Sequence, residues 1–194
     1  MELSLSVSGL ASEALRHAVK EWETWSDERL PYGEIICIRV VDGSILRSDQ
    51  DNRIVGGDRQ IEEGSLFRLV DPKRPDLTTK GRRIHSGSKV ALRHMSSANF
   101  VSADFDRGGQ LTVSWATEVR GWETFRLQAV GRRSRLNALP FGTRVTLLVE
   151  SEFDSEVRWW YLRFWLSEDQ RVSADADIAQ EWEHFVIANP LRPH

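Results

Sequence analysis

The sequence repeats one pattern of short strands three times, and this repetition constrains the fold more than any other feature. In each copy a strand ends in an aspartate, and these segments align with one another at 45–49, 100–104 and 171–175. Each copy ends in a strand with a phenylalanine at 67, 125 or 185, which gives spacings of 58 and 60 residues. Each copy also opens with a strand shortly after a glycine, at 36–40, 90–93 and 145–149. Self-similarity at a fixed period of this kind indicates a repeat architecture.

The middle copy shows the pattern of one unit. Alternation predicts strands at 89–93, 100–103, 111–115 and 123–127, with turns at 95–99 and 107–109 between the first three. Within the third strand, Leu111, Val113 and Trp115 are expected to face the same side. Four strands cannot bury their own apolar face, and closing three such units removes exposed sheet edges. We therefore predict an all-β fold, a β-trefoil with repeats at about 33–71, 87–130 and 142–189.

These motifs also carry a family resemblance. Lys-Val-Ala-Leu-Arg at 89–93, Phe-Val-Ser-Ala-Asp at 100–104 and Gly-Trp-Glu-Thr-Phe-Arg-Leu at 121–127 resemble the repeat of the fascin-like β-trefoil family. The third copy carries the pattern at 171–175 and 181–185, whereas the first has Gly64 where the others have Trp122 and Trp182. The resemblance implies the trefoil fold over about 33–189. Fascins join several trefoils to bundle actin filaments, and this chain has one, so no functional residue is transferred.

The sequence before the repeats forms a separate segment. Residues 2–8 alternate like a strand, and an apolar stripe through Leu15, Trp22 and Trp25 is typical of an amphipathic helix that begins after Ser12. We expect residues 1–32 to be an amino-terminal appendage and residues 33–194 to be the trefoil. The appendage either packs against the barrel or serves as a docking helix.

Composition excludes several classes of function. A net charge of −3 on 194 residues gives no reason to expect binding to nucleic acid, and we expect no membrane insertion. The five histidines show no metal-ligand spacing, and the single cysteine offers no partner ligand. No nucleophile elbow, phosphate-binding loop or dinucleotide-binding glycine pattern occurs. We therefore expect a non-catalytic protein without metal or cofactor. Residues 1–30 lack the pattern of a secretory signal, which favours the cytoplasm, although leaderless export stays open.

The linkers between the repeats are basic. The pseudo-threefold axis places them at the same end of the barrel, where their cations could form one positive surface for a phosphate, a sulfate or an acidic protein patch. The alternative is that they are solvated loops. The residues of this predicted basic patch are Lys73, Arg74, Arg82, Arg83, Arg132, Arg133 and Arg135.

The third copy contains an insertion. From Asp49 to Asp104 is 55 residues, but from Asp104 to Asp175 is 71, so that about sixteen extra residues lie near 150–166. Five aromatic residues gather at 159–165. Alternation places Trp159, Tyr161 and Trp165 on one face, which is either an exposed platform or is covered by the amino-terminal helix.

These observations together predict a ligand-binding module. Carbohydrate is the first expectation, because aromatic faces stack on sugar rings while charged side chains fix the hydroxyls. The predicted ligand-binding residues are Trp159, Tyr161, Arg163 and Trp165. The alternative is a protein-interaction or inhibitor module that uses the basic linkers and loops, and a cytoskeletal, actin-binding module is one form of it. The sequence leaves the ligand and the oligomeric state open.

Overall fold

The computed structural model describes residues 29–76, 81–115, 118–131, 138–153, 156–166 and 169–191. The expected amino-terminal strand and helix lie outside these residues, as do Arg132, Arg133 and Arg135. The domain boundary at residue 32 therefore stays a prediction. Leu30 and Tyr32, however, belong to the main hydrophobic core.

The described part of the chain is all-β, as predicted, with twelve strands and three short 3-10 helices. The 3-10 helices are η1 (Glu63–Ser65), η2 (Phe105–Arg107) and η4 (Glu181–Glu183). The strands are β1 (Ile35–Val40), β2 (Leu46–Ser48), β3 (Ile54–Gly56), β4 (Phe67–Val70), β5 (Ser88–His94), β6 (Val101–Asp104), β7 (Gln110–Val113), β8 (Phe125–Ala129), β9 (Arg144–Phe153), β10 (Glu156–Phe164), β11 (Val172–Ala176) and β12 (Phe185–Ala188).

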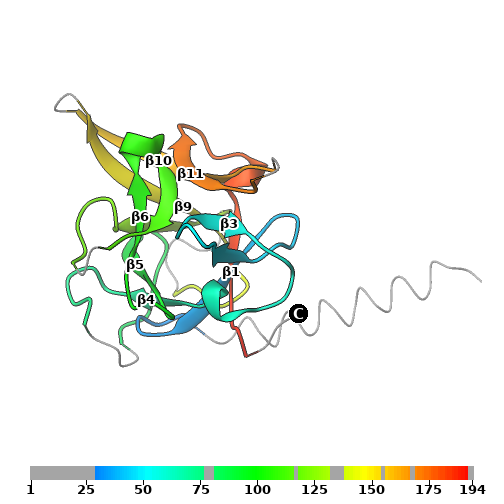
Figure 1. The fold of residues 1–194 in the computed structure, drawn as a ribbon. Coiled ribbons are helices and arrows are strands. Elements are labelled where there is room, and N and C mark those ends of the chain that lie inside the picture. The colour runs from blue at the N-terminus through cyan, green and yellow to red at the C-terminus, as the bar shows by residue number, and fades with distance from the viewer. Residues whose placement is uncertain are drawn as a thin grey trace, which may run out of the picture.

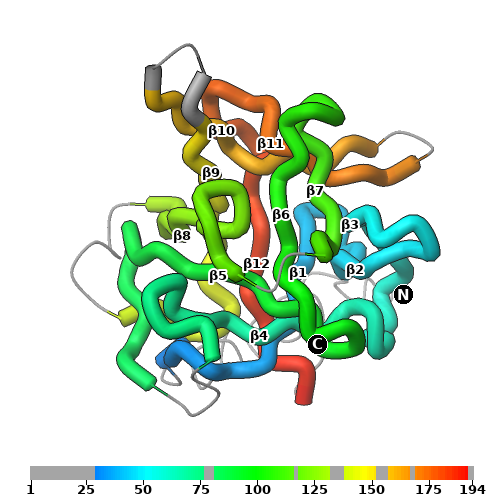
Figure 2. The backbone as a smooth tube through the Cα atoms, turned by 60° about the vertical axis from the view of Figure 1, so that its left-hand side comes forward, coloured from blue at the N-terminus to red at the C-terminus, as the bar shows by residue number. Residues whose placement is uncertain are grey.

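Six of these strands close into a barrel (Figures 1 and 2). The order around the ring is β1, β4, β5, β8, β9, β12 and back to β1, with every neighbouring pair antiparallel. These are the opening and closing strands of the three copies in the sequence. The inner strands of the copies form separate pairings, β2 with β3, β6 with β7, and the end of β10 with β11.

The core of the barrel repeats with the sequence. The phenylalanine that begins each closing strand, at 67, 125 and 185, is fully buried, and so are Ile36, Val90 and Val145 on the opening strands. All six belong to one core cluster. Removing these side chains from water is the main favourable contribution to folding, which explains why the apolar positions recur in each copy.

A side-chain cap fixes the turn before each closing strand. Ser65, Glu123 and Glu183 each stand two residues before a core phenylalanine, and each is buried. Their side-chain oxygens accept hydrogen bonds from the backbone N–H three residues earlier, at 2.9, 3.0 and 2.7 Å. Buried polar groups are tolerated only when such bonds replace those to water. The three copies therefore share one cap that is built from different residues.

The insertion in the third copy is a long hairpin. Strands β9 and β10 pair from Phe153 and Glu156 down to Leu148 and Tyr161, and the hairpin projects beyond the barrel at the upper left of Figure 1. Beyond Tyr161, β10 leaves β9 and pairs with β11, with an irregular register at that point. Strand β10 thus belongs to two pairings, with the barrel strand β9 along its first half and with β11 along its second half.

The predicted position of Trp115 was wrong. Strand β7 ends at Val113, and both the backbone N–H and the hydroxyl of Ser114 donate to the carbonyl of Phe100. These are the last bonds that the chain makes to its neighbouring strand, so Trp115 lies beyond the ladder, is 86% exposed and does not pack with Leu111 and Val113.

His94 is a buried polar group on β5. Its Nδ1 lies 3.0 Å from Ser97 Oγ, and its Nε2 lies 3.1 Å from Ser48 Oγ and 3.3 Å from the Gly64 carbonyl. Burial lowers the pKa of His94 from 6.5, and the Gly64 carbonyl and the charge of Glu63 only partly offset this effect. The folded protein therefore favours the neutral ring.

This burial predicts a pH dependence of stability. Because the folded-state pKa is the lower one, the unfolded chain takes up the proton first as pH falls through 6.5. The contribution of neutral His94 is thus present above pH 6.5 and lost below it. Urea denaturation at pH 7.5 and pH 5.0 should show a smaller pH effect on the free energy of unfolding in His94→Gln than in the wild type. An equal pH effect in the two proteins would contradict this role.

Two adjacent glycines test the packing between the second and third copies. Both have positive φ, but a Cβ at Gly109 would meet the Ala174 carbonyl oxygen at 2.4 Å, whereas a Cβ at Gly108 would meet nothing within 4 Å. We expect Gly109→Ala to lower the free energy of unfolding by roughly 3 kcal/mol and Gly108→Ala by only about 1 kcal/mol, measured by urea denaturation. Equal losses would mean that the contact with β11 adds nothing to the backbone strain.

Candidate functional site

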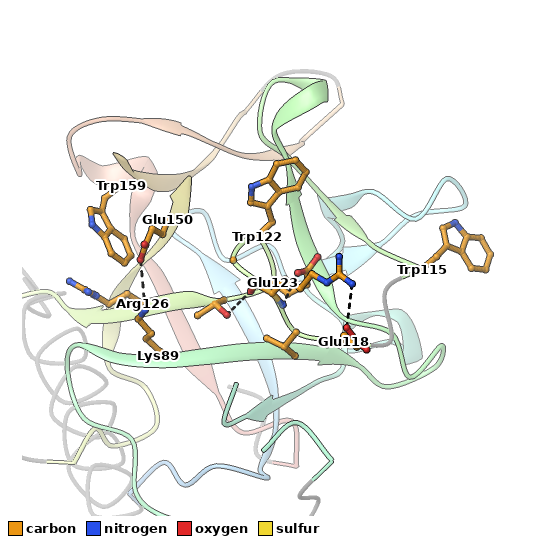
Figure 3. Close-up of a pocket in the computed structure, with 12 residues that line it drawn as sticks. Lys89, Trp115, Glu118, Trp122, Glu123, Arg126, Glu150 and Trp159 are labelled. Carbon is orange, nitrogen blue, oxygen red and sulfur yellow. Dashed lines mark hydrogen bonds and ion pairs between the residues drawn. The ribbon is translucent and has the colours of Figure 1, made fainter. Parts of the chain in front are cut away.

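An open groove runs beside the inserted hairpin (Figure 3). Its volume is about 920 Å³. The walls come from β5, β8, the β9–β10 hairpin and the segment that precedes β8. The lining residues are Lys89, Trp115, Glu118, Val119, Arg120, Gly121, Trp122, Glu123, Thr124, Arg126, Glu150 and Trp159. Three tryptophans, three basic side chains and three acidic side chains therefore share one concave surface, which we call the tryptophan groove.

Trp159 forms one end of the tryptophan groove. It lies on β10 opposite Glu150 of β9, and the Arg126 guanidinium lies over its ring, 4.0 Å from the centroid. Arg126 stands opposite Lys89 in the β5–β8 pair, and Lys89 Nζ lies 3.7 Å from Glu150 Oε2. The like charges of Lys89 and Arg126 are thus balanced by a carboxylate and by the face of the indole.

Arg126 keeps unused hydrogen-bonding capacity. Its Nε is buried and has no acceptor among the described residues. A buried donor without a partner is costly. The same orphan Nε occurs in Arg39 on β1 and Arg68 on β4, so it recurs with the barrel and does not mark this site. Arg126 contributes to the groove through its position over Trp159.

Trp122 projects from the capped turn before β8. Its ring is 40% exposed and makes an edge contact with Phe105, with the centroids 5.7 Å apart. The turn beneath it is held by Glu123, which accepts from the Arg120 N–H, and by Thr124, whose hydroxyl donates to the Arg120 carbonyl at 2.7 Å. These bonds present one open indole face in a fixed orientation.

The opposite end of the tryptophan groove carries Trp115, which lies far to the right of Trp159 in Figure 3. Between the two, Arg120 pairs with Glu118 at 3.3 Å on an exposed surface. Exposed pairs of this kind contribute little to stability. Their side chains are therefore free to exchange this partner for polar groups on a ligand.

The structure does not bring the four predicted ligand-binding residues together. Trp159 lines the tryptophan groove, but Tyr161, Arg163 and Trp165 do not. Trp165 is half-buried beside β11, and its Nε1 donates to Ser173 Oγ at 2.7 Å. The predicted aromatic face is therefore neither a free platform nor fully covered, and a ligand-binding role for these residues stays a prediction.

Arg163 has a structural partner. Its Nε donates to Glu183 Oε1 at 2.6 Å, and this contact raises the pKa of the guanidinium. Glu183 is the cap of the third copy and is only 2% exposed in its side chain. A buried carboxylate requires such a partner, which makes Arg163 a support for the fold.

The predicted basic patch is partly assembled. Lys73, Arg74, Arg82 and Arg83 line a second pocket of about 680 Å³, together with Lys89. The second basic linker, with Arg132, Arg133 and Arg135, lies outside the described residues.

Sequence reasoning missed Trp122, Arg126 and Glu150 as site residues. Trp122 was interpreted as part of the repeat motif, because an equivalent Trp182 occurs in the third copy. The available signal was the first copy, where Gly64 replaces the tryptophan: an indole that one copy lacks is not required by the core. Nothing in the sequence marks Arg126 and Glu150, because their approach to Trp159 depends on strand register.

The described residues contain neither a metal site nor a membrane-spanning helix. Within them, no group of three or more His, Cys, Asp or Glu side chains is arranged to hold a metal ion. No helix in that part of the chain has the length and apolar character needed to span a bilayer.

Comparison with known proteins reveals relatives in structure only. No family model matches the chain, and no curated protein matches it in sequence. The SDF2-like protein from Arabidopsis thaliana is similar in structure, with a TM-score of 0.59 and 15% identity over 82% of this chain and 94% of that one. These values show a shared fold and no more.

A second similar structure is the S. cerevisiae protein O-mannosyltransferase Pmt1-Pmt2 complex bound to the sugar donor. The TM-score is 0.60 and the identity 14%, over 87% of this chain but only 27% of that chain. The likeness thus concerns about a quarter of that larger protein. The resemblance to the fascin-like family stays a prediction.

The two arginines that flank Trp165 test the support role of Arg163. Arg163 and Arg171 lie 5.2 and 5.4 Å from the Trp165 centroid, but only Arg163 pairs with buried Glu183. We expect Arg163→Gln to lower the free energy of unfolding by about 2 kcal/mol, because a buried carboxylate loses its partner. Arg171→Gln should cost less than about 0.5 kcal/mol. Thermal and urea denaturation of both variants measure the difference, and a stable Arg163→Gln protein would return Arg163 to the candidate ligand-binding residues.

Proposed function

We propose that the chain contains a single β-trefoil domain that acts as a non-catalytic carbohydrate-binding module. The trefoil assignment is supported by the closed six-stranded barrel, by the three outer strand pairings and by the threefold repeat in the sequence. A trefoil supplies no chemistry by itself, so the function rests on the site grafted onto it.

The observation that carries the proposal is that Trp122 and Trp159 line the same groove. Aromatic faces stack on the apolar faces of sugar rings, and ligand sites combine such surfaces with a few placed polar groups. The tryptophan groove offers Thr124, Glu150 and Lys89 for hydroxyls. The site proposed here keeps Trp159 from the sequence prediction and replaces its other members by Trp122 and Arg126.

A protein-interaction module is the second candidate, and Trp115 favours it. Trp115 is 86% exposed, so its large apolar ring faces water unless a partner covers it. Tryptophan is also enriched at the centres of protein interfaces. An inhibitor or a cytoskeletal partner, actin included, falls under this alternative. A cytoplasmic location remains the expectation from the sequence.

A glycan array with the purified full chain tests the first candidate, and the repeat supplies a matched control. Trp122 and Trp182 occupy equivalent turns and are 40% and 37% exposed, but only Trp122 lines the groove. We expect Trp122→Ala to weaken binding of an array hit about tenfold, which is about 1.4 kcal/mol, because the ligand loses one aromatic stacking face. Trp182→Ala should bind like the wild type.

Isothermal titration of the array hit measures these affinities, and circular dichroism checks that both variants fold. Equal losses in the two variants would place the ligand elsewhere. An array without hits, together with a partner captured only when Trp115 is intact, would replace the carbohydrate proposal with the protein-interaction alternative.

A further inference from the structure

The second pocket concentrates positive charge beside the tryptophan groove. We call it the basic pocket. It lies between the turn at 71–74, the segment at 81–85 and the start of β5. Its permanent cations are Lys73, Arg74, Arg82, Arg83 and Lys89, and its only acidic lining residue among those described is Asp71. The whole chain carries a net charge of −3, so this excess of cations is local.

Most of these charges have no counterion among the residues that the structure describes. Asp71 Oδ2 lies 3.3 Å from Arg82, and Asp71 Oδ1 accepts the Lys73 N–H at 3.0 Å. Lys73, Arg74 and Arg83 form no salt bridge with a described residue. Cations held close together without counterions attract an anion strongly, and arginine binds planar or tetrahedral oxyanions through paired N–H groups.

Tyr32 holds the walls of the basic pocket in place. Its N–H donates to the Arg82 carbonyl at 3.0 Å, and its own carbonyl accepts the Gly81 N–H at 2.8 Å. Its hydroxyl donates to the Lys89 carbonyl at 2.8 Å, which ties the 81–83 segment to β5. These bonds fix the backbone that carries Arg82 and Lys89, so part of the pocket is already in place before a ligand binds.

Lys89 joins the two pockets. It lines both of them, and its cross-strand neighbour Arg126 lies on Trp159. A continuous path therefore leads from the unpaired cations, through Lys89, to the indole of Trp159. We propose that the two pockets form one site for an acidic carbohydrate, whose sulfate or carboxylate groups occupy the basic pocket while a sugar ring stacks in the tryptophan groove; this rests on the proposed carbohydrate function.

The site differs from a single-stranded nucleic-acid track in where its aromatic faces lie. Such tracks stack successive bases on aromatic faces along the line of cations. In the described basic pocket the rings are those of buried Tyr32 and exposed His85, and the tryptophans lie in the neighbouring groove. We argue for a glycan because a sulfate needs only the cations and one sugar ring needs only one indole, and an oligothymidine serves as the competing ligand in the test.

The test compares a heparin-derived tetrasaccharide with its desulfated counterpart by isothermal titration of the full chain. We expect the sulfated tetrasaccharide to bind about tenfold more tightly at 50 mM NaCl. This preference should shrink at 300 mM NaCl, because salt screens exposed charges. Equal affinities would overturn the acidic-carbohydrate proposal, and they would leave the proposed function intact if Trp122→Ala still weakened binding. Tighter binding of an oligothymidine of matched charge would also overturn it.

Charge variants locate the anion. Lys73→Gln/Arg74→Gln should weaken binding of the sulfated tetrasaccharide about fivefold or more and leave the desulfated one unchanged. Arg59→Gln/Arg107→Gln removes the same charge from two exposed arginines that line neither pocket, and should alter neither affinity. Trp122→Ala should weaken the binding of both tetrasaccharides.

The variants also separate the two proposals. Sulfate-dependent binding with the same affinity in Trp122→Ala as in the wild type would overturn both the single site and the sugar-stacking groove. Equal effects of the two charge variants would show attraction by net charge alone and overturn the assigned anion position. No binding of either tetrasaccharide would overturn this inference, and the glycan array then decides the proposed function separately.

Discussion

The structure depends on the burial of one phenylalanine from each copy in a common core. Phe67, Phe125 and Phe185 begin the closing strands, and the caps before them orient the backbone so that each ring enters the barrel. Losing any of these rings would leave a cavity that the other two copies cannot fill, since core substitutions of this type cost about 3–5 kcal/mol. The turns, the caps and the outer hairpins are all arranged around that shared centre.

The repeat in the sequence was enough to predict the barrel, because its signal comes from the core. The starts of the opening and closing strands were placed within about two residues, since their apolar positions recur at a fixed spacing. Strand β9, predicted at 145–149, runs on to Phe153 because the insertion extends it. Trp115 shows where such reasoning fails. Alternation extends to it in the sequence, but the strand ends where Ser114 bonds to Phe100. The end of a strand is set by its partner, which periodicity does not identify.

The candidate site was harder to predict, because its residues meet only through tertiary register. Arg126 and Trp159 are 33 positions apart and touch because β8 and β10 flank β9. Arg163 looked like a ligand-binding residue beside aromatic neighbours, but its partner is a buried carboxylate twenty positions away. The insertion and its Trp159 were visible in advance, because a departure from the repeat is detectable without knowing its contacts.

The path of the barrel also sets an order of events during synthesis. Strand β12 supplies the partner for β1 and completes the ring with β9, yet it follows every other barrel strand in the chain. Until β12 has been made, the edge of β1 that it will cover has no partner. An open strand edge is prone to pair with other chains. The last barrel strand to be synthesised is thus also the one that removes the open edge of the first.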